Sequence, residues 1–273
     1  MNNKPWQLQL IKKSLKKKQK LKILNKYLKI DPSSTILDLG CAQGILSYFL
    51  QQKGGTWIST DLDLDNLNTS RNLLKKNLIQ IGPGVLPFKD KSFDWVISLD
   101  YLEHLDDDQQ CLEEIHRILK TGGQVLLATP RTGNIFILHK IRSFLGLKLE
   151  FYGHKREGYT LKDLKTKFEK ANLIVFKNKR FSQFFSEFLE LVLNFVYIKF
   201  LAPKRKKLLR DGHIRPSSEE EFHSKKKALK LYNYIYPVVR LLSLLDIFLF
   251  WQRGYGIMVW AEKEENNPQK KCR

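Results

Sequence analysis

The feature that most constrains the fold of this sequence is a regular alternation, between residues 35 and 179, of short apolar runs and longer amphipathic segments. The apolar runs have the length and composition of buried strands. The amphipathic segments have helical spacing and are ten or so residues long, enough to cross between parallel strands. We predict strands at 35–39, 56–60, 78–81, 93–99, 124–128 and 173–176, and helices at 45–52, 64–76, 106–119 and 161–171. The pattern predicts an α/β fold with a doubly wound, mainly parallel sheet.

A glycine-containing turn joins the first predicted strand to the first predicted helix of this alternation. Gly40 lets the backbone turn sharply, and Gly44 lets a ligand approach the start of the helix. The next strand ends at Asp61, whose carboxylate can accept two hydrogen bonds from the cis-diol of a ribose. Asp61 could instead only cap the following helix. We favour ribose binding because the acid and the glycine loop occur together.

Four motifs follow one another in this region. In chain order they are Leu37-Asp38-Leu39-Gly40-Cys41-x-x-Gly44, Leu86-Pro87-Phe88-x-Asp90-x-Ser92-Phe93-Asp94-x-Val96, Leu102-Glu103-His104-Leu105 and Arg117-Ile118-Leu119-Lys120-x-Gly122-Gly123. Together they resemble the class I S-adenosylmethionine (SAM)-dependent methyltransferases, in the branch that acts on small molecules. The resemblance covers about residues 30–180 and the final strand. It implies a seven-stranded, mostly parallel, Rossmann-like sheet whose last strand is antiparallel, with SAM as the cofactor.

The resemblance also implies which residues bind the cofactor. Asp38, Gly40 and Gly44 would shape the methionine pocket, and Asp61 would hold the ribose. Leu62 would pack on the adenine, and we place Cys41 and Asp100 in the same set.

Two departures from the family pattern concern this cofactor site. Ala42 stands where the family often has glycine, which narrows the loop slightly. The segment 81–84, Ile-Gly-Pro-Gly, has no acid that could bind the adenine amino group.

A nicotinamide dinucleotide is the alternative cofactor, since such sites also use a glycine-rich turn. The spacing here is Gly40-x-x-x-Gly44, without the Gly-x-Gly-x-x-Gly pattern of dinucleotide sites, so we favour SAM. The three cysteines, Cys41, Cys111 and Cys272, lie far apart without metal-ligand spacing. We therefore expect reduced thiols and no metal site.

Candidate catalytic residues follow the predicted strands at 93–99 and 124–128. His104 is the candidate general base, because an imidazole titrates near neutral pH. The glycine-flexed segment 151–159 could close over a substrate, and we assign His154 and Tyr159 to the substrate side. Both assignments have structural alternatives, in which His104 only anchors its loop and 151–159 is only a connection.

The sequence divides into a core and added segments. We expect a basic amphipathic helix at 1–30, the SAM-binding α/β core at 31–180, a helical insertion at 181–253, the final strand of the core at 254–264 and a disordered tail at 265–273. The insertion contains two long apolar helices with narrow polar stripes, at 181–203 and 228–251. They form a cap over the core, contact a membrane, or do both.

The net charge of +20 predicts attraction to polyanions without selecting one. Basic runs flank the apolar insertion helices, which favours an anionic membrane surface. A nucleic acid partner is less favoured because no RNA-binding module or base-methylation motif is present. Lysine-rich composition could also serve solubility alone. No signal-peptide core occurs at the N-terminus and no charge-free stretch of about 20 residues exists, so we expect a cytoplasmic protein, peripheral at the inner membrane face if it binds lipid.

Three functions remain open. The favoured one is a methyltransferase for a small-molecule, lipid or lipid-linked acceptor. The others are an RNA or DNA methyltransferase, and a relative that has kept the fold as a non-catalytic binding module.

Overall fold

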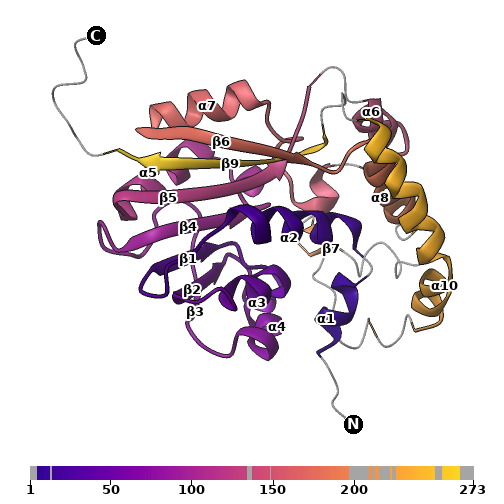
Figure 1. The fold of residues 1–273 in the computed structure, drawn as a ribbon, viewed down its shortest axis with the longest axis horizontal. Coiled ribbons are helices and arrows are strands. Elements are labelled where there is room, and N and C mark those ends of the chain that lie inside the picture. The colour runs from indigo at the N-terminus through magenta and orange to yellow at the C-terminus, as the bar shows by residue number, and fades with distance from the viewer. Residues whose placement is uncertain are drawn as a thin grey trace.

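A computed structural model describes residues 5–12, 14–133, 137–147, 149–196, 209–210, 213–214, 222, 226–249 and 254–264. Its centre is a seven-stranded sheet in the order β3-β2-β1-β4-β5-β9-β6, in which β9 runs antiparallel to both of its neighbours (Figure 1). The expected mostly parallel sheet with an antiparallel last strand is confirmed. The strands are β1 Thr35–Leu39, β2 Thr56–Asp61, β3 Leu78–Gln80, β4 Phe93–Leu99, β5 Leu119–Pro130, β6 Leu173–Phe181 and β9 Gly256–Lys263.

Helices cover both faces of the sheet (Figure 1), and the described residues also include three short 3₁₀ turns. A separate two-stranded ribbon pairs β7, Leu209–Arg210, with β8, His213–Ile214. The helices are α1 Trp6–Ile11, α2 Leu15–Tyr27, α3 Ile45–Gln51, α4 Leu64–Leu74, α5 Asp108–Ile118, α6 Ile137–Phe144, α7 Leu161–Lys170, α8 Phe184–Val196 and α10 Lys226–Ser243, and the 3₁₀ turns are Leu102–His104, Leu149–Tyr152 and Leu244–Leu249.

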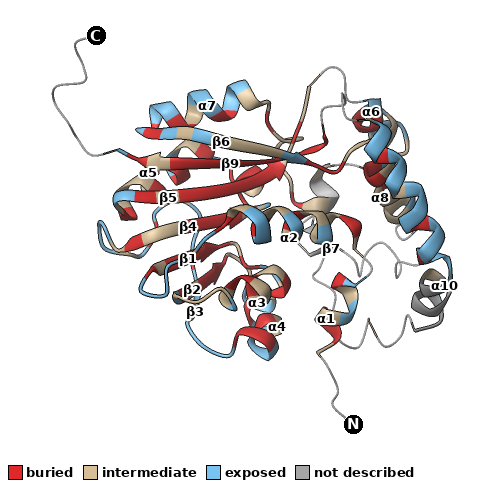
Figure 2. Ribbon diagram, in the orientation of Figure 1, coloured by how far each residue is buried: buried red, intermediate tan, exposed pale blue. Residues whose placement is uncertain are grey.

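The central strands are buried on both sides, as a parallel sheet between two helical layers requires (Figure 2). Side chains alternate between two clusters. Ile36 and Ile97 face the layer that contains α2, whereas Leu37 and Val96 face the layer that contains α5 and α7. This alternation explains why the strands read as continuous apolar runs in the sequence.

The segment predicted as one N-terminal helix forms two helices, α1 and α2. The break lies at Ser14, which has an extended backbone and whose side chain accepts a hydrogen bond from the Lys17 backbone N–H. A serine in this position caps a new helix. The cap lets α2 lie along the sheet, where Leu24 and Leu28 are buried.

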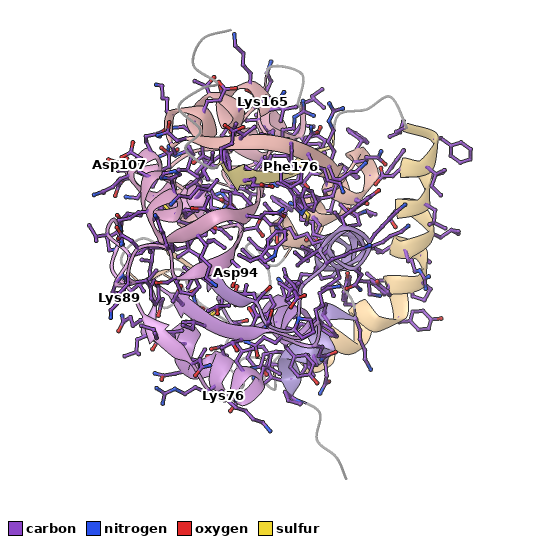
Figure 3. All side chains as sticks on the ribbon, turned by 60° about the vertical axis from the view of Figure 1, so that its left-hand side comes forward. Lys76, Lys89, Asp94, Asp107, Lys165 and Phe176 are labelled. Carbon is purple, nitrogen blue, oxygen red and sulfur yellow. The ribbon has the colours of Figure 1, made fainter. Side chains whose placement is uncertain are left out.

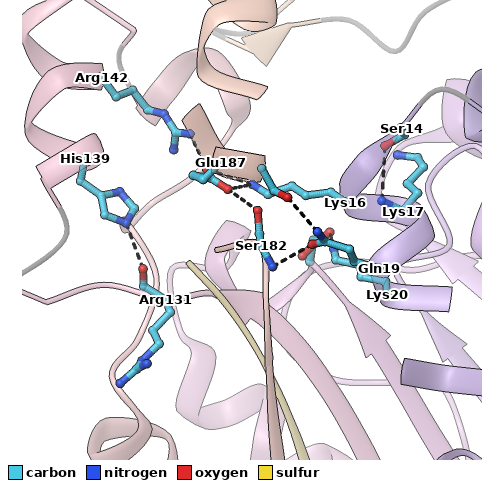
Figure 4. A network of polar contacts seen from close by, with 12 residues as sticks. Ser14, Lys16, Lys17, Gln19, Lys20, Arg131, His139, Arg142, Ser182 and Glu187 are labelled. Carbon is cyan, nitrogen blue, oxygen red and sulfur yellow. Dashed lines mark hydrogen bonds and ion pairs between the residues drawn. The ribbon is translucent and has the colours of Figure 1, made fainter. Parts of the chain in front are cut away.

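The two described helices of the insertion, α8 and α10, pack together with α6, which precedes β6 in the chain. We call α6, α8 and α10 the helical cap. Figure 1 shows these helices together beyond the carboxyl end of β5. The cap is joined to the core by Glu187 of α8, which is 2% exposed. Its carboxylate lies 2.8 Å from the Lys16 ammonium, 2.9 Å from the Arg142 guanidinium and 2.8 Å from the Ser182 hydroxyl, which donates to it (Figure 4).

Burial alone would raise the pKa of Glu187, but the two cations outweigh it and lower the pKa to about 2. The carboxylate is therefore charged and fully paired. The ends of the insertion helices at 197–203 and 250–251, and the tail at 265–273, lie outside the described residues.

Several boundaries differ from the predicted ones, including those of β5, which runs from Leu119 to Pro130 and not from 124 to 128, and two others differ for identifiable reasons. β6 continues to Phe181 because it pairs with the whole of β9, whereas the sequence after 176 is rich in lysine and reads as a surface segment. The helix expected from residue 106 begins at Asp108, since the Asp107 carboxylate caps it by accepting from the Gln110 N–H.

Candidate functional site

The loop between β1 and α3 turns at two glycines with positive φ. Gly40 has φ +83°, and a Cβ there would lie 2.5 Å from Cδ2 of Tyr101. Gly44 has φ +75°, and a Cβ there would lie 3.0 Å from the Ser70 Cβ on α4. Both glycines are therefore required by backbone conformation and by close packing. The close neighbour of Gly44 is α4, a reason for glycine that the sequence did not indicate.

Ala42, at the tip of this loop, has φ +47°, a conformation that a glycine would adopt at lower cost. Its N–H donates to Oδ2 of Asp61 at 2.7 Å. The acid at the end of β2 and the glycine loop thus form one continuous wall, as the predicted ribose site requires.

Asp61 is 7% exposed, and its carboxylate is the polar centre of this wall. Its Oδ1 accepts from the Asp63 N–H at 2.9 Å and from the Asn66 amide at 3.0 Å. A carboxylate offers about four acceptor positions, and these contacts leave one on Oδ2. A diol that donates two hydrogen bonds to Asp61 would therefore require one present donor, such as the Asn66 side chain, to move away. Leu62 beside it is half-buried and packs against the core.

Asp38 and Cys41 lie beneath the loop. The Asp38 carboxylate is 3% exposed and accepts from the Ser59 hydroxyl at 2.8 Å, and burial raises its pKa to about 6. Cys41 is buried, and burial raises the pKa of its thiol. The backbone N–H groups of Gly40 and Cys41 both donate to the carbonyl of Thr60. These buried contacts hold the loop in its shape. Because the Cys41 side chain is buried among them, any contact of Cys41 with a cofactor would come from its backbone.

Asp100 follows β4 and faces the N-terminal region of the chain. It has φ +55°, and its carboxylate forms an ion pair with the ammonium of Lys20 on α2. Burial opposes ionisation of Asp100, but the Lys20 charge outweighs that and lowers its pKa. Tyr101, the next residue, is buried against Gly40. The turn after β4 therefore borders the glycine loop directly.

The two predicted catalytic histidines lie side by side although 50 residues separate them in the sequence. The rings of His104 and His154 meet edge to face with centroids 4.8 Å apart. Nδ1 of His104 lies 3.0 Å from the Gly153 carbonyl, which fixes Nδ1 as the donor and leaves Nε2 as the basic nitrogen. Burial, with the His104 neighbour, lowers the pKa of His154 to about 3, so His154 is neutral.

Glu103 completes this group, which we call the acceptor cluster: Glu103, His104 and His154. Glu103 is fully buried, and burial, with the nearby Asp100, raises its pKa to about 8. Its Oε2 accepts from the Thr129 hydroxyl at 3.1 Å, whereas its Oε1 has no hydrogen-bond partner among the described residues. Each of the three residues offers one atom that could bind a metal ion, a ring nitrogen or a carboxylate oxygen, and these atoms all lie within 4.8 Å of one another. Polar atoms therefore converge at the carboxyl end of β4.

Tyr159, which the sequence analysis assigns to the substrate side, is buried in the structure. It is 3% exposed, and its hydroxyl donates to Asp108 at 2.7 Å and lies 3.3 Å from the Leu102 carbonyl. Asp108 also binds Arg156 and lies 2.8 Å from Lys167. Tyr159 thus tethers the segment after β5 to α5. The sequence suggested a loop residue because polar neighbours surround it, but its ring packs in the main core.

The sequence placed Glu103 among the candidates that follow the strand at 93–99 but assigned it no role, and it did not indicate Lys20 at all. Glu103 stood in the recognised motif beside His104, so its position after a buried strand was a usable signal. Lys20 is one of ten lysines among the first 30 residues, and nothing in the sequence distinguishes it from the others. Its burial at 4% exposure is evident only in the structure.

The sheet order, the glycine loop and the acid after β2 define a Rossmann-like methyltransferase fold. A family model described as "Methyltransferase domain" matches residues 37–127. Among curated proteins, the chain is 29% identical over 133 residues to a ubiquinone biosynthesis O-methyltransferase from Pelagibacter ubique, covering 47% of this chain and 54% of the relative. It is 26% identical over 183 residues to phosphoethanolamine N-methyltransferase 2 from Caenorhabditis elegans, covering 64% and 40%. The chain thus spans about half or less of these relatives.

Solved structures agree on the fold. The YcgJ protein of Bacillus subtilis superimposes with a TM-score of 0.56 at 16% identity, covering 90% of this chain and 98% of that one. Phosphoethanolamine N-methyltransferase 2 of Haemonchus contortus, in complex with SAM, gives 0.57 at 19% identity, covering 91% and 53%. Residues 37–127 of this chain match the methyltransferase-domain family, and its sheet has the Rossmann-like fold of the class I SAM-dependent methyltransferases.

Proposed function

We propose that this chain transfers the methyl group of SAM to a small-molecule acceptor held at the acceptor cluster. The observation that carries the proposal is the contact between the two halves of the cofactor wall, in which Asp61 at the end of β2 accepts from the Ala42 N–H of the glycine loop. The named relatives support the reaction class, since they methylate small molecules.

When bound, SAM supplies an electrophilic methyl group on a sulfonium. The residues of this chain have four tasks around it. Asp61 holds the ribose by accepting hydrogen bonds, and Tyr101 against Gly40 helps to exclude water from the loop. His104, whose Nδ1 is bound to the Gly153 carbonyl, is assigned as the general base, which would take a proton from an acceptor hydroxyl or ammonium through its other ring nitrogen. The neutral His154 restricts the His104 ring to one orientation.

The test is calorimetric titration with S-adenosylhomocysteine of the wild-type protein and two matched variants. Asp61→Ala should weaken binding by about 1–3 kcal/mol, the cost of losing charged acceptors in a buried site. Asp63→Ala removes a carboxylate two residues away that only accepts from the Asp65 N–H, and it should leave binding unchanged. Absence of binding to wild-type protein, or equal losses in both variants, would contradict the proposal.

We extend the proposal to a lipid or lipid-linked acceptor, since one end of the helical cap carries exposed apolar side chains from α10 and the following 3₁₀ turn. Radioactive methyl transfer from SAM into extracted fractions tests this extension. Label should enter the lipid fraction and not the nucleic acid fraction. Label in nucleic acid would instead support the RNA or DNA methyltransferase alternative.

A further inference from the structure

The outer side of α10 and of the 3₁₀ turn after it presents an apolar surface that no described residue covers. We call it the outer apolar face, and five side chains that are 58% to 85% exposed define it: Tyr234, Val238, Leu241, Ile247 and Phe248. Residues 234, 238 and 241 follow the four- and three-residue spacing of one side of a helix. Figure 2 shows this side of α10 as exposed. A helix that only covered a core would have a polar outer side.

The inner side of α10 already accounts for the packing of the cap. Tyr236 and Val239 are buried there with Leu15 of α2, and the Lys18 ammonium donates to the Tyr236 hydroxyl at 3.0 Å. The helix therefore has apolar residues on two sides, one satisfied within the molecule and one exposed. The exposed side requires a separate explanation.

The charged residues of the segment 226–249 indicate what kind of partner binds the outer apolar face. Asp246 is the only acid in 226–249, and it is 5% exposed because its carboxylate accepts from the Phe185 and Ser186 N–H groups at the start of α8. The same stretch contains Lys226, Lys227, Lys230 and Arg240, and the chain carries a net charge of +20. An exposed apolar surface on a basic stretch of sequence, with no exposed acid within 226–249, matches an anionic lipid bilayer.

We propose that the outer apolar face docks the protein on an anionic membrane surface, with apolar side chains in the interface and flanking cations on the head groups. A second copy of the chain fits less well, because two proteins of charge +20 repel each other. No helix of the described residues is long and apolar enough to span a bilayer, so the contact is peripheral. Docking itself does not depend on the proposed function. Only the route of the acceptor, which would enter from the lipid side of the cap, rests on that function.

The position of the cap agrees with this orientation. α8 packs against α10, and its Glu187 pairs with Lys16 and with Arg142, whose guanidinium lies 5.9 Å from the Tyr152 ring. Tyr152 in turn lies 5.9 Å from the His154 ring. The outer apolar face and the acceptor cluster are thus connected through packed side chains at the same end of the sheet.

The experiment is co-sedimentation of the full chain with vesicles of phosphatidylcholine alone or mixed with phosphatidylglycerol, at low and high salt. The double variant Leu241→Glu, Phe248→Glu disrupts the outer apolar face. The control is Ile174→Glu, Phe176→Glu on β6, which makes the same charge change at side chains 44% and 52% exposed (Figure 3 labels Phe176). Wild type and control should bind the mixed vesicles, more weakly at high salt, and the α10 variant should bind about tenfold or more weakly.

Three results would overturn docking through this face. Wild type could fail to sediment with the mixed vesicles, or both variants could lose binding equally, which would reflect total charge alone. Sedimentation velocity could also reveal a dimer that only the α10 variant dissociates, which would make a second copy the partner. Titration with S-adenosylhomocysteine separates the two proposals. Retained binding in the α10 variant shows an intact core, and vesicle binding without cofactor binding would contradict the proposed function alone.

Discussion

Lys20 of α2 and Asp100 at the end of β4 form an ion pair whose two partners differ greatly in exposure. The Lys20 side chain is 5% exposed and that of Asp100 is 44% exposed. The pair joins the N-terminal helix to the turn that precedes the acceptor cluster. The Lys20 ammonium also lies over a ring inside the protein, 5.2 Å from the centre of Phe181.

This asymmetry predicts unequal effects of removing either partner. Asp100→Asn retains a residue type that tolerates the positive φ at this position. The substitution leaves the buried Lys20 ammonium without its counter-charge, which should lower the free energy of unfolding by about 2–4 kcal/mol. Lys20→Met leaves a half-exposed carboxylate that water can solvate, and the loss should be below about 1 kcal/mol. Urea denaturation near neutral pH measures both. Equal losses would show that the ammonium is solvated in the protein.

Glu103 predicts an unusual pH dependence of stability. Its pKa is raised from an ordinary 4.5 to about 8 in the folded protein, so the folded state holds its proton more tightly than the unfolded state. The contribution of Glu103 is therefore fully present below pH 4.5 and is lost as pH rises toward 8. In Glu103→Gln, a component of up to about 1.4 kcal/mol per pH unit should vanish from this window.

Thermal or urea unfolding of both proteins across this window tests the prediction. Exposed Glu113→Gln on α5 is the matched control and should follow wild type. If Glu103→Gln and wild type had parallel profiles, Glu103 would be ionised in the folded protein.

His104 and Tyr159 should separate catalysis from stability. His104→Asn removes the basic Nε2 and should lower kcat/KM by about 10²- to 10⁴-fold, with binding of S-adenosylhomocysteine unchanged. Tyr159→Phe removes the hydroxyl bound to Asp108 and should lower the free energy of unfolding by about 1 kcal/mol with near-normal kcat/KM. Methyl-transfer kinetics and urea denaturation, measured on both variants, check the pair. A large kinetic loss in Tyr159→Phe would restore it to the substrate side.

The sequence predicts the α/β core well because the core follows local rules. The bounds of β1 and β4 match the predicted 35–39 and 93–99, since each is an apolar run bordered by polar residues or glycine. The wall of Asp61 and the glycine loop is also predictable, because the ends of neighbouring parallel strands meet at one edge of the sheet.

Contacts between distant segments could not be predicted in the same way. Lys16 and Glu187 are separated by 171 residues, and each resembles many other charged residues of this chain. The burial of Tyr159 could not be predicted, because its polar local sequence does not indicate that its hydroxyl donates to Asp108 inside the core. The meeting of His104 with His154 likewise depends on where the segment after β5 returns to the sheet.

The central position of β9 sets the order in which the sheet can be completed. β9 lies between β5 and β6, although residues 182–255 separate it from β6 in the chain. During synthesis, β5 and β6 therefore have no strand between them until residues 256–263 emerge, and both keep unpaired backbone groups until then. The helices α6, α8 and α10 are made before the sheet beneath them closes, so the nascent chain depends on protection of these edges against aggregation until β9 has paired.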